Sequence, residues 1–512
     1  MAIERPAALF DRVTEWDDLV RFATEPTTSF RIGVVSGRRR QGKSFILDEI
    51  TRQVGGFYHQ ALEEERAPAL ERLGAAMAAD RGLAGGSLAF PDWSALLRAL
   101  AEPTTPVYRS TIAARPEPAS SAAPSPRLVV IDEYPYLLAK SPDIASAIQL
   151  AYDDARLGKG SPLRLILCGS AMSVMAGLLS GQRALRGRAV LDLVVDPFDY
   201  REAAAFWDVG GDPRLAFLLF CVVGGTPGYR DLLEMGPPTS VADFGAWLAR
   251  GVLNPSHAMF HETDYLLAEE PSLTDRAIYQ SALAAIAAGR TTSGAVAGAL
   301  GRPETSITHV LDGLERARFI ERADDVLRSR RPALRITDAM LRFQHAIIRP
   351  DFHRFESRQT LAAWSDATAR FESGVAGPAF EAIARAWTSR YASAETLGGT
   401  AARVGSTVVN DSTGRSRVEI DVVALEARSD DEAGVNPRLL LIGEAKSGSD
   451  PRGIADLQRL ERARGLLAGR TRVERTRLAI FAVGGFTADL QDEAARRSDV
   501  VLVDLERLYA GD

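Results

Sequence analysis

The stretch that decides the fold is residues 30–44, Phe-Arg-Ile-Gly-Val-Val-Ser-Gly-Arg-Arg-Arg-Gln-Gly-Lys-Ser. Its first seven residues are mainly apolar and predict a buried strand. The last eight match G-x-x-x-x-G-K-[ST], and the apolar pattern after them predicts a helix. In such a loop the backbone N–H groups face phosphates at a helix N-terminus. We therefore predict a nucleotide site built from Gly37, Gln41, Gly42, Lys43 and Ser44.

A second motif, Leu-Val-Val-Ile-Asp-Glu, occupies residues 128–133. Its four apolar residues predict a central strand that ends in two acids. Paired with a P-loop, Asp132 is expected to share Mg²⁺ with the Ser44 hydroxyl, and Glu133 to act on the attacking water, while Lys43 reaches the β- and γ-phosphates. Taken alone, the motif is also compatible with a strand that ends in two solvated carboxylates.

Three more residues are candidates for the same reaction. Ser170 ends the apolar strand predicted over 164–170 and fits a polar sensor beside the γ-phosphate. Arg186 and Arg188 follow in Gln-Arg-Ala-Leu-Arg-Gly-Arg, and either one fits an arginine finger. The alternatives are an ordinary serine at a strand end and two surface arginines.

Strands and helices alternate over the first 195 residues, which predicts an α/β fold with a parallel sheet. Further strands are expected at 56–59, 127–133 and 189–195, and a proline-rich loop at 103–126. A helical stretch follows to about residue 253. We predict three domains: a P-loop core with this helical stretch, called the lid below, over 1–250, a winged helix-turn-helix over 270–350, and an α/β domain over 370–512.

The predicted winged helix comprises three helices and two short strands around an arginine-rich tip. Residues 273–349 hold 12 arginines against eight acids, a local charge of +4. Ser306, Thr308 and His309 on the third helix are candidates for contact with a DNA groove, and Arg328, Arg330 and Arg331 for contact with phosphates. Packing against the lid or docking of a protein is the alternative.

The C-terminal region carries a second carboxylate pattern. Strands are expected over 402–409, 418–426, 438–445, 477–483 and 499–504, with helices over 372–390 and 451–467. Glu444 and Lys446 alternate onto one strand face, and Asp421 can meet them from the neighbouring strand. Two carboxylates suit Mg²⁺, and a lysine beside them can orient an attacking water. Glu381, and Gln458 in support, complete the set; the alternative is an ion pair without chemistry.

These motifs resemble the archaeal-type P-loop ATPases of the AAA/STAND-like, or DEXX-box, division that carry a DUF234-type C-terminal region. The similarity rests on the P-loop and on residues 129–137, 167–175, 185–188, 197–202 and 224–229. It implies an ASCE/AAA-like ATPase core, then a winged helix, then a restriction-endonuclease-like PD-(D/E)xK domain. The loop at 103–126 departs from this pattern, as does the polar stretch 428–437, which lengthens the Asp421–Glu444 spacing.

Composition bounds these hypotheses. A net charge of −6 excludes coating of nucleic acid through bulk charge, and two cysteines exclude a disulfide scaffold. No stretch resembles a membrane span or a signal peptide, so a cytoplasmic protein is expected. Only four of the 61 basic residues are lysines, and two of them are Lys43 and Lys446. A simple ion pair can use arginine, which favours a chemical role for these two ammonium groups.

We therefore expect an ATP- and Mg²⁺-dependent ATPase that acts on DNA and carries a nuclease-like domain. The alternative is a regulatory nucleotide switch that binds DNA or protein partners without cleavage. The sequence leaves open whether the chain forms a homo-oligomer and which arginine is the finger.

Overall fold

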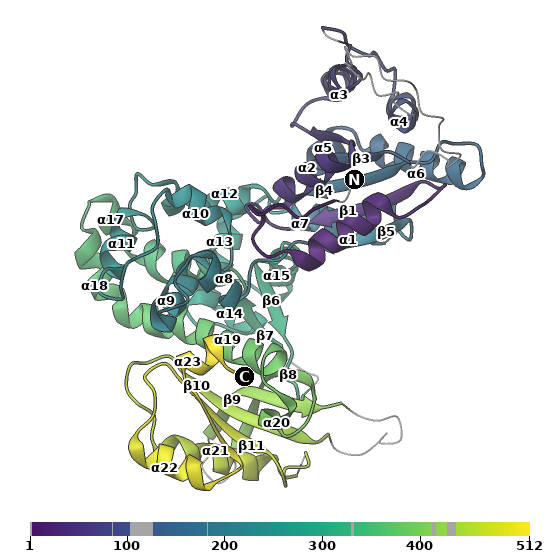
Figure 1. Cartoon of the computed structure of the whole chain (residues 1–512). Helices are drawn as coiled ribbons and strands as arrows, with labels where there is room; N and C mark the ends of the chain where they lie inside the picture. Colours follow the sequence, from purple (N-terminus) through teal and green to yellow (C-terminus); the bar gives the residue numbers. More distant parts are fainter. Residues whose placement is uncertain are drawn as a thin grey trace. The chain divides into compact units, whose positions relative to one another are not determined.

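The computed structural model divides the chain into two compact units, which are described separately below (Figure 1). Unit 1 is Met1–Pro197 with Ala268–Ser272, and unit 2 is Phe198–Leu267 with Leu273–Asp512. The structure describes residues 3–83, 85–102, 126–181, 183–328, 332–411, 416–427, 437–469 and 471–512. Residues 103–125 of the proline-rich loop, Arg330, Arg331 and residues 428–436 lie outside the described residues.

Unit 1 contains a five-stranded sheet in which every pairing is parallel, as predicted. The strand order is β2-β3-β4-β1-β5. The strands are β1 (Arg31–Ser36), β2 (Phe57–Gln60), β3 (Leu128–Asp132), β4 (Arg164–Gly169) and β5 (Ala189–Val194). Strands β1, β3 and β4 are almost wholly buried. Their unbroken apolar runs follow from helices covering both faces of the sheet.

Helices pack on both faces of this sheet. One hydrophobic core contains Trp16, Leu19 and Ile50 from the first two helices together with residues of the sheet. A second core contains Leu73, Trp93 and residues of the other helices, also together with residues of the sheet. The helices of unit 1 are α1 (Val13–Thr24), α2 (Lys43–Val54), α3 (Arg66–Asp80), α4 (Trp93–Ala101), α5 (Tyr134–Lys140), α6 (Asp143–Arg156) and α7 (Met172–Leu178).

The first four helices of unit 2 lie in the stretch predicted as the lid, and a 3₁₀ turn and one further helix follow it. They are α8 (Tyr200–Phe206), α9 (Pro213–Val223), α10 (Gly228–Leu233), α11 (Phe244–Arg250), the 3₁₀ turn η1 (Ala258–His261) and α12 (Glu262–Ala268). Phe217 of α9 stacks edge-on against Phe380, with ring centroids 5.5 Å apart, in one core that also contains Trp247 and Trp387. These helices therefore pack with C-terminal residues, whereas the sequence grouped them with the P-loop core.

Three helices and a two-stranded antiparallel hairpin follow. They are α13 (Arg276–Ala287), α14 (Ser293–Ala299), α15 (Glu304–Arg316), β6 (Ile320–Ala323) and β7 (Ala333–Ile336). Ser306, Thr308 and His309 lie on α15, and the last two are exposed. Beyond the hairpin lie α16 (Ala339–Phe343), the π-helical turn η2 (Gln344–Ile348), η3 (Arg349–Asp351), α17 (Phe352–Glu356), α18 (Thr360–Phe371) and a second π-helical turn, η4 (Glu372–Ala376).

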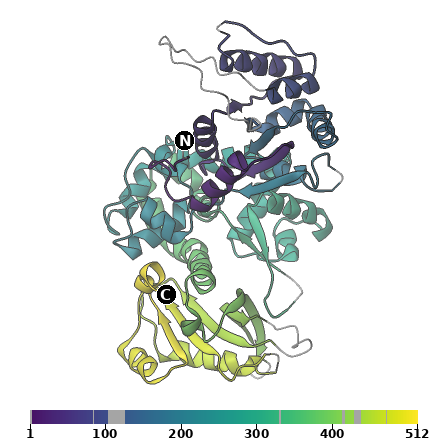
Figure 2. The same ribbon diagram turned by 45° about the vertical axis from the view of Figure 1, so that its right-hand side comes forward.

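The C-terminal part of unit 2 holds a second five-stranded sheet, of order β12-β11-β10-β9-β8. Its elements are α19 (Gly377–Arg390), α20 (Ala394–Leu397), β8 (Ala401–Asp411), β9 (Ser416–Glu426), β10 (Leu439–Lys446), α21 (Ile454–Leu467), β11 (Arg477–Ala482), α22 (Ala488–Arg496), β12 (Val500–Val503) and α23 (Leu505–Ala510). Strands β8, β9 and β10 pair antiparallel, and β10, β11 and β12 pair parallel. Helix α19 packs on one face and α21 with α22 on the other (Figures 1 and 2).

A bulge interrupts the antiparallel pairing of β8 with β9 in the interval that contains Asp421. Gly405 pairs with Val423 and Thr407 with Ile420, so β9 carries one residue more than β8 across the interval. Bulges change the direction of side chains and are frequent near active sites.

No helix in the described ranges is long and apolar enough to cross a membrane.

Gly225, from the Gly-Gly-Thr-Pro stretch, provides a test of this packing. A Cβ there would lie 1.8 Å from the Phe198 carbonyl oxygen, and the Phe198 N–H donates to the Gly225 carbonyl at 2.8 Å. We expect Gly225→Ala to lower the free energy of unfolding by about 1–3 kcal/mol, because the backbone must move apart. Urea unfolding measures this. Gly210→Ala, whose Cβ meets nothing within 4 Å, is the control, and equal stability of both variants would contradict the close approach.

Candidate functional site

The P-loop connects β1 to α2 and has the shape its glycines allow. A Cβ on Gly37 would lie 2.5 Å from the Val195 carbonyl oxygen, so only glycine fits there. Gly42 has a φ of 88°, a left-handed conformation that favours glycine, and it directly precedes α2. The buried Lys43 ammonium donates to the Arg38 carbonyl at 2.8 Å within the loop, and Gln41 is also buried. The loop is thus folded back onto the helix N-terminus.

The two predicted motifs meet in a direct contact. The Ser44 hydroxyl donates to Asp132 Oδ2 at 2.6 Å, and the Tyr58 hydroxyl from β2 donates to the same oxygen at 2.6 Å. Burial raises the pKa of the Asp132 carboxyl, but hydrogen bonds from Cys168, Ser44 and Tyr58 outweigh it and leave that pKa below its usual value. The carboxylate therefore stays charged, as a metal ligand must. Sequence reasoning missed Tyr58 because its role requires β2 to pair with β3.

Glu133 and Ser170 lie together at the carboxyl ends of β3 and β4. The Ser170 hydroxyl donates to Glu133 Oε2 at 3.1 Å. Glu133 has a φ of 52°, an uncommon conformation for a residue with a side chain, directly before α5. Burial and then the negative charge of Asp132 raise the pKa of the Glu133 carboxyl above its usual value. Such a carboxylate accepts a proton more readily, which suits a group that orients or deprotonates water.

The two finger candidates have local partners. The Arg188 guanidinium pairs with Asp153 at 2.9 Å and also donates to the Ala184 carbonyl. Arg186 is exposed and donates to the Gly181 carbonyl at 2.9 Å. Of the two, Arg186 has the more exposed side chain, and its finger role stays a prediction.

The segment Ala268–Ser272 adds two residues that the sequence did not indicate. Glu269 forms an ion pair with Arg39 of the P-loop. The buried Glu270 accepts from the Met172 N–H at 2.6 Å and from the Ser173 hydroxyl at 2.6 Å, at the start of α7. These carboxylates tie the segment to the loop and to the helix just after Ser170. Two adjacent glutamates in a polar stretch give no local signal of such contacts.

In unit 2, Glu444 and Lys446 interact as the alternation predicts. The Lys446 ammonium lies 2.5 Å from Glu444 Oε1, and the Arg459 guanidinium of α21 lies 3.3 Å from the same oxygen. Gln458, named from the sequence as a supporting residue, is exposed, and its neighbour Arg459 makes the contact instead. Glu444 is buried between two cations.

Asp421 approaches the same strand through its backbone. Its Oδ2 accepts from the Ala445 N–H at 2.8 Å, between Glu444 and Lys446 in the chain. From α19, Arg385 donates to the Asp421 carbonyl at 3.0 Å and lies 3.5 Å from Glu381. Burial, with the charges of Glu381 and Glu444, raises the pKa of Asp421 to about 7. Glu381, Asp421 and Glu444 thus share one electrostatic environment.

The fit of a metal ion differs between the two sites. At the P-loop, a serine hydroxyl and a charged carboxylate already touch, and both are oxygen donors that Mg²⁺ accepts together with phosphate oxygens and water. Among the described residues there is no group of three or more His, Cys, Asp or Glu arranged to hold a metal. Any ion at Asp421 and Glu444 would therefore rest on two carboxylates and compete with Lys446 and Arg459.

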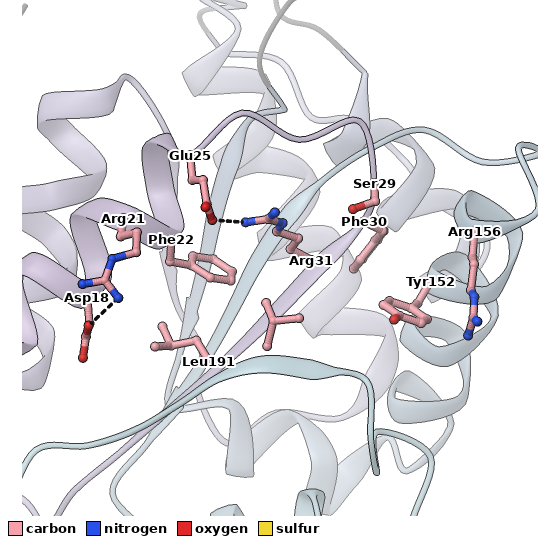
Figure 3. Close-up of a pocket in the computed structure, with 11 residues that line it drawn as sticks. Asp18, Arg21, Phe22, Glu25, Ser29, Phe30, Arg31, Tyr152, Arg156 and Leu191 are labelled. Atoms are coloured by element: carbon pink, nitrogen blue, oxygen red, sulfur yellow. Dashed lines mark hydrogen bonds and ion pairs between the residues drawn. The ribbon is translucent and has the colours of Figure 1, made fainter.

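A separate pocket of about 540 Å³ lies at the amino end of β1, away from the P-loop (Figure 3). Arg31 pairs with Glu25 at 2.8 Å and Arg21 with Asp18 at 3.2 Å in its wall. None of the predicted site residues lines it.

Comparisons with known proteins give distant likenesses. No family model matches the chain. The uncharacterized protein MJECL04 of Methanocaldococcus jannaschii is 25% identical over 237 residues, which are 45% of this chain and 51% of that protein. The alignment thus spans about half the length of this relative.

Two solved structures are similar to the chain. The Walker-type ATPase PABY2304 of Pyrococcus abyssi has 18% identity and a TM-score of 0.47, covering 67% of this chain and 97% of its own. The ORC2 protein of Aeropyrum pernix, in ADPNP–ADP complexes, has 13% identity and a TM-score of 0.39, covering 70% and 96%. The function proposed below rests on the geometry of the chain's own residues.

Glu270 provides a test of the contact at α7. Glu270→Ala leaves the buried Met172 N–H without its acceptor, so we expect the free energy of unfolding of unit 1 to fall by about 1–3 kcal/mol. Urea unfolding of the full chain measures this. The control is Glu102→Ala, which removes a weak surface pair with Arg81 at 3.8 Å and should cost less than about 1 kcal/mol. Equal effects would show that Glu270 contributes no buried hydrogen bond.

Proposed function

We propose that the chain binds ATP with Mg²⁺ at the P-loop and hydrolyses it. The observation that carries this proposal is the 2.6 Å contact between the Ser44 hydroxyl and the Asp132 carboxylate. Residues 88 positions apart supply the two oxygen donors that a nucleotide-bound Mg²⁺ requires, directly beside a lysine at a helix N-terminus. A structural serine–aspartate contact alone needs neither the lysine nor the glycine loop.

Each residue then has a distinct task. Lys43 leaves the Arg38 carbonyl and neutralises phosphate oxygens, while the loop N–H groups hold the phosphates. Ser44 and Asp132 would hold Mg²⁺, which offsets the negative charge that develops during phosphoryl transfer. Glu133 orients the attacking water, and Ser170 holds Glu133 in place through its hydroxyl. Arg186 is the better placed of the two arginines to act on a phosphate, since Arg188 is paired with Asp153.

We also propose that the chain acts on DNA, with residues 270–350 as a winged helix and residues 370–512 as a Mg²⁺-dependent nuclease-like domain. The convergence of Glu381, Asp421, Glu444 and Lys446 from one helix and two strands supports this. Lys446 would orient the attacking water and the carboxylates would hold the metal.

One observation favours the alternative of a nucleotide switch that does not cut. Glu444 already pairs with both Lys446 and Arg459, so its charge is compensated without a metal. A switch would still use the ATPase site, and unit 2 would bind its partner as a passive surface.

The ATPase proposal predicts different outcomes for two variants. Lys43→Ala should weaken ATP binding and abolish turnover, because the phosphates lose their cation. Glu133→Gln should keep ATP binding but slow hydrolysis by about 10²–10⁴-fold. Phosphate release and binding of a fluorescent ATP analogue measure the two steps. The exposed Lys140, changed to alanine, is the control, and wild-type turnover in both site variants would refute the assignment.

The nuclease proposal predicts Mg²⁺-dependent nicking or cutting of DNA that is lost in Asp421→Ala and Lys446→Ala. The exposed Lys159, changed to alanine, should leave cleavage unchanged. Gel analysis of plasmid and oligonucleotide substrates, with and without ATP, measures this. Intact ATPase activity without cleavage of any substrate would favour the nucleotide switch.

A further inference from the structure

A cavity of about 750 Å³ opens in unit 2 beside helix α19. Its walls come from the hairpin β6–β7, the two π-helical turns η2 and η4, helix α19 and strands β8 and β9. Several of these elements, β7, α19 and β8, lie side by side in Figure 1. The sequence does not indicate this cavity, because its lining residues range along the chain from Ile286 to Glu419.

Two arginines from different elements, Arg335 and Arg385, line this cavity. Arg335 of β7 donates to the Ser406 hydroxyl at 2.7 Å, and Arg385 of α19 donates to the Asp421 carbonyl at 3.0 Å. Two guanidinium groups in one cavity wall attract an anion, and phosphate matches the planar fork of arginine.

The cavity shares Glu381 with the predicted carboxylate site. Glu381 and Glu419 line it, and Arg385 belongs to both the cavity and the surroundings of Asp421. A phosphodiester held by Arg335 and Arg385 therefore lies next to the carboxylates proposed to support its hydrolysis.

The lining of the cavity carries two signs of a functional site. Both π-helical turns contribute to it, and such turns occur often at functional sites. His345 on η2 is 5% exposed, and neither ring nitrogen has a hydrogen-bond partner. A buried polar group without a partner costs free energy, which a packing role alone does not offset.

The volume of the cavity favours a single nucleic acid strand over a double helix. Its volume lies within the range of about 300–1,000 Å³ typical of small-ligand pockets. One or two nucleotides fit such a space, whereas a double helix does not. The walls also carry acids, among them Glu321 at 4.0 Å from Arg335, so a broad basic surface for duplex DNA is absent from this lining.

We propose that this cavity binds the unpaired end of a single nucleic acid strand, with Arg335 and Arg385 on its phosphates, and delivers that end to the carboxylate site. The inference rests on the proposed action of the chain on nucleic acid. It adds that the substrate is a single-stranded end and not continuous duplex.

Binding in EDTA tests the proposal separately from cleavage. Fluorescence anisotropy compares a labelled 12-nucleotide single strand with the same sequence as a blunt duplex. We expect the full chain to bind the single strand at least about tenfold more tightly, and Arg335→Gln to weaken this binding about tenfold or more. With two phosphates held, the logarithm of the binding constant should fall with the logarithm of salt with a slope of only about −1.4.

Two further variants keep the test decisive. Arg496→Gln, at an exposed position on α22, is the matched control and should bind like wild type. Arg335→Lys retains the charge without the fork, so partial loss of binding is expected even if Arg335→Gln unfolds. The proposal would be overturned if the duplex bound as tightly as the single strand or more tightly, and if this binding were lost in Arg302→Gln but unchanged in the Arg335 variants. Arg302 is exposed just before α15, so that result would indicate contact through the winged helix. Single-strand binding without cleavage would support this cavity while contradicting the nuclease proposal.

Discussion

The hydrogen bond from Ser44 to Asp132 is the interaction on which the rest of unit 1 depends. It requires β1 and β3 to end at the same edge of a parallel sheet, with α2 starting directly behind the P-loop. The buried Asp132 carboxylate is stabilised by hydrogen bonds from Cys168, Ser44 and Tyr58 and from the Glu133 backbone N–H. A buried charge without such donors would be strongly unfavourable. The order of the strands, and not only their presence, therefore creates the charged centre.

Unit 2 depends on a different constraint, the burial of large aromatic side chains. Phe217, Trp247, Phe380 and Trp387 lie in one core that joins the predicted lid helices to α19 and the second sheet. This core holds α19 against β9, which brings Glu381 and Arg385 to Asp421. The carboxylate site and the neighbouring cavity are consequences of how these apolar faces pack.

The segment Ala268–Ser272 is held by the side chains of two adjacent glutamates. It is continuous in the chain with residues of unit 2, yet Glu269 and Glu270 bind to the P-loop and to the start of α7. Its contacts are with Arg39 of the P-loop and with Met172 and Ser173, which follow Ser170 in the chain.

The sequence by itself determined the parallel sheet, the P-loop and the pairing of Lys446 with Glu444, because these follow from local apolar runs, short motifs and the two-residue period of a strand. It did not indicate Tyr58, Glu270, Arg385 or Arg459, whose roles come from elements distant in the chain. Nor did it place the lid helices with the C-terminal core, since an apolar helix face does not specify its partner. Only the tertiary structure decided those contacts, because burial selects a partner surface through shape and hydrogen bonding that no local pattern encodes.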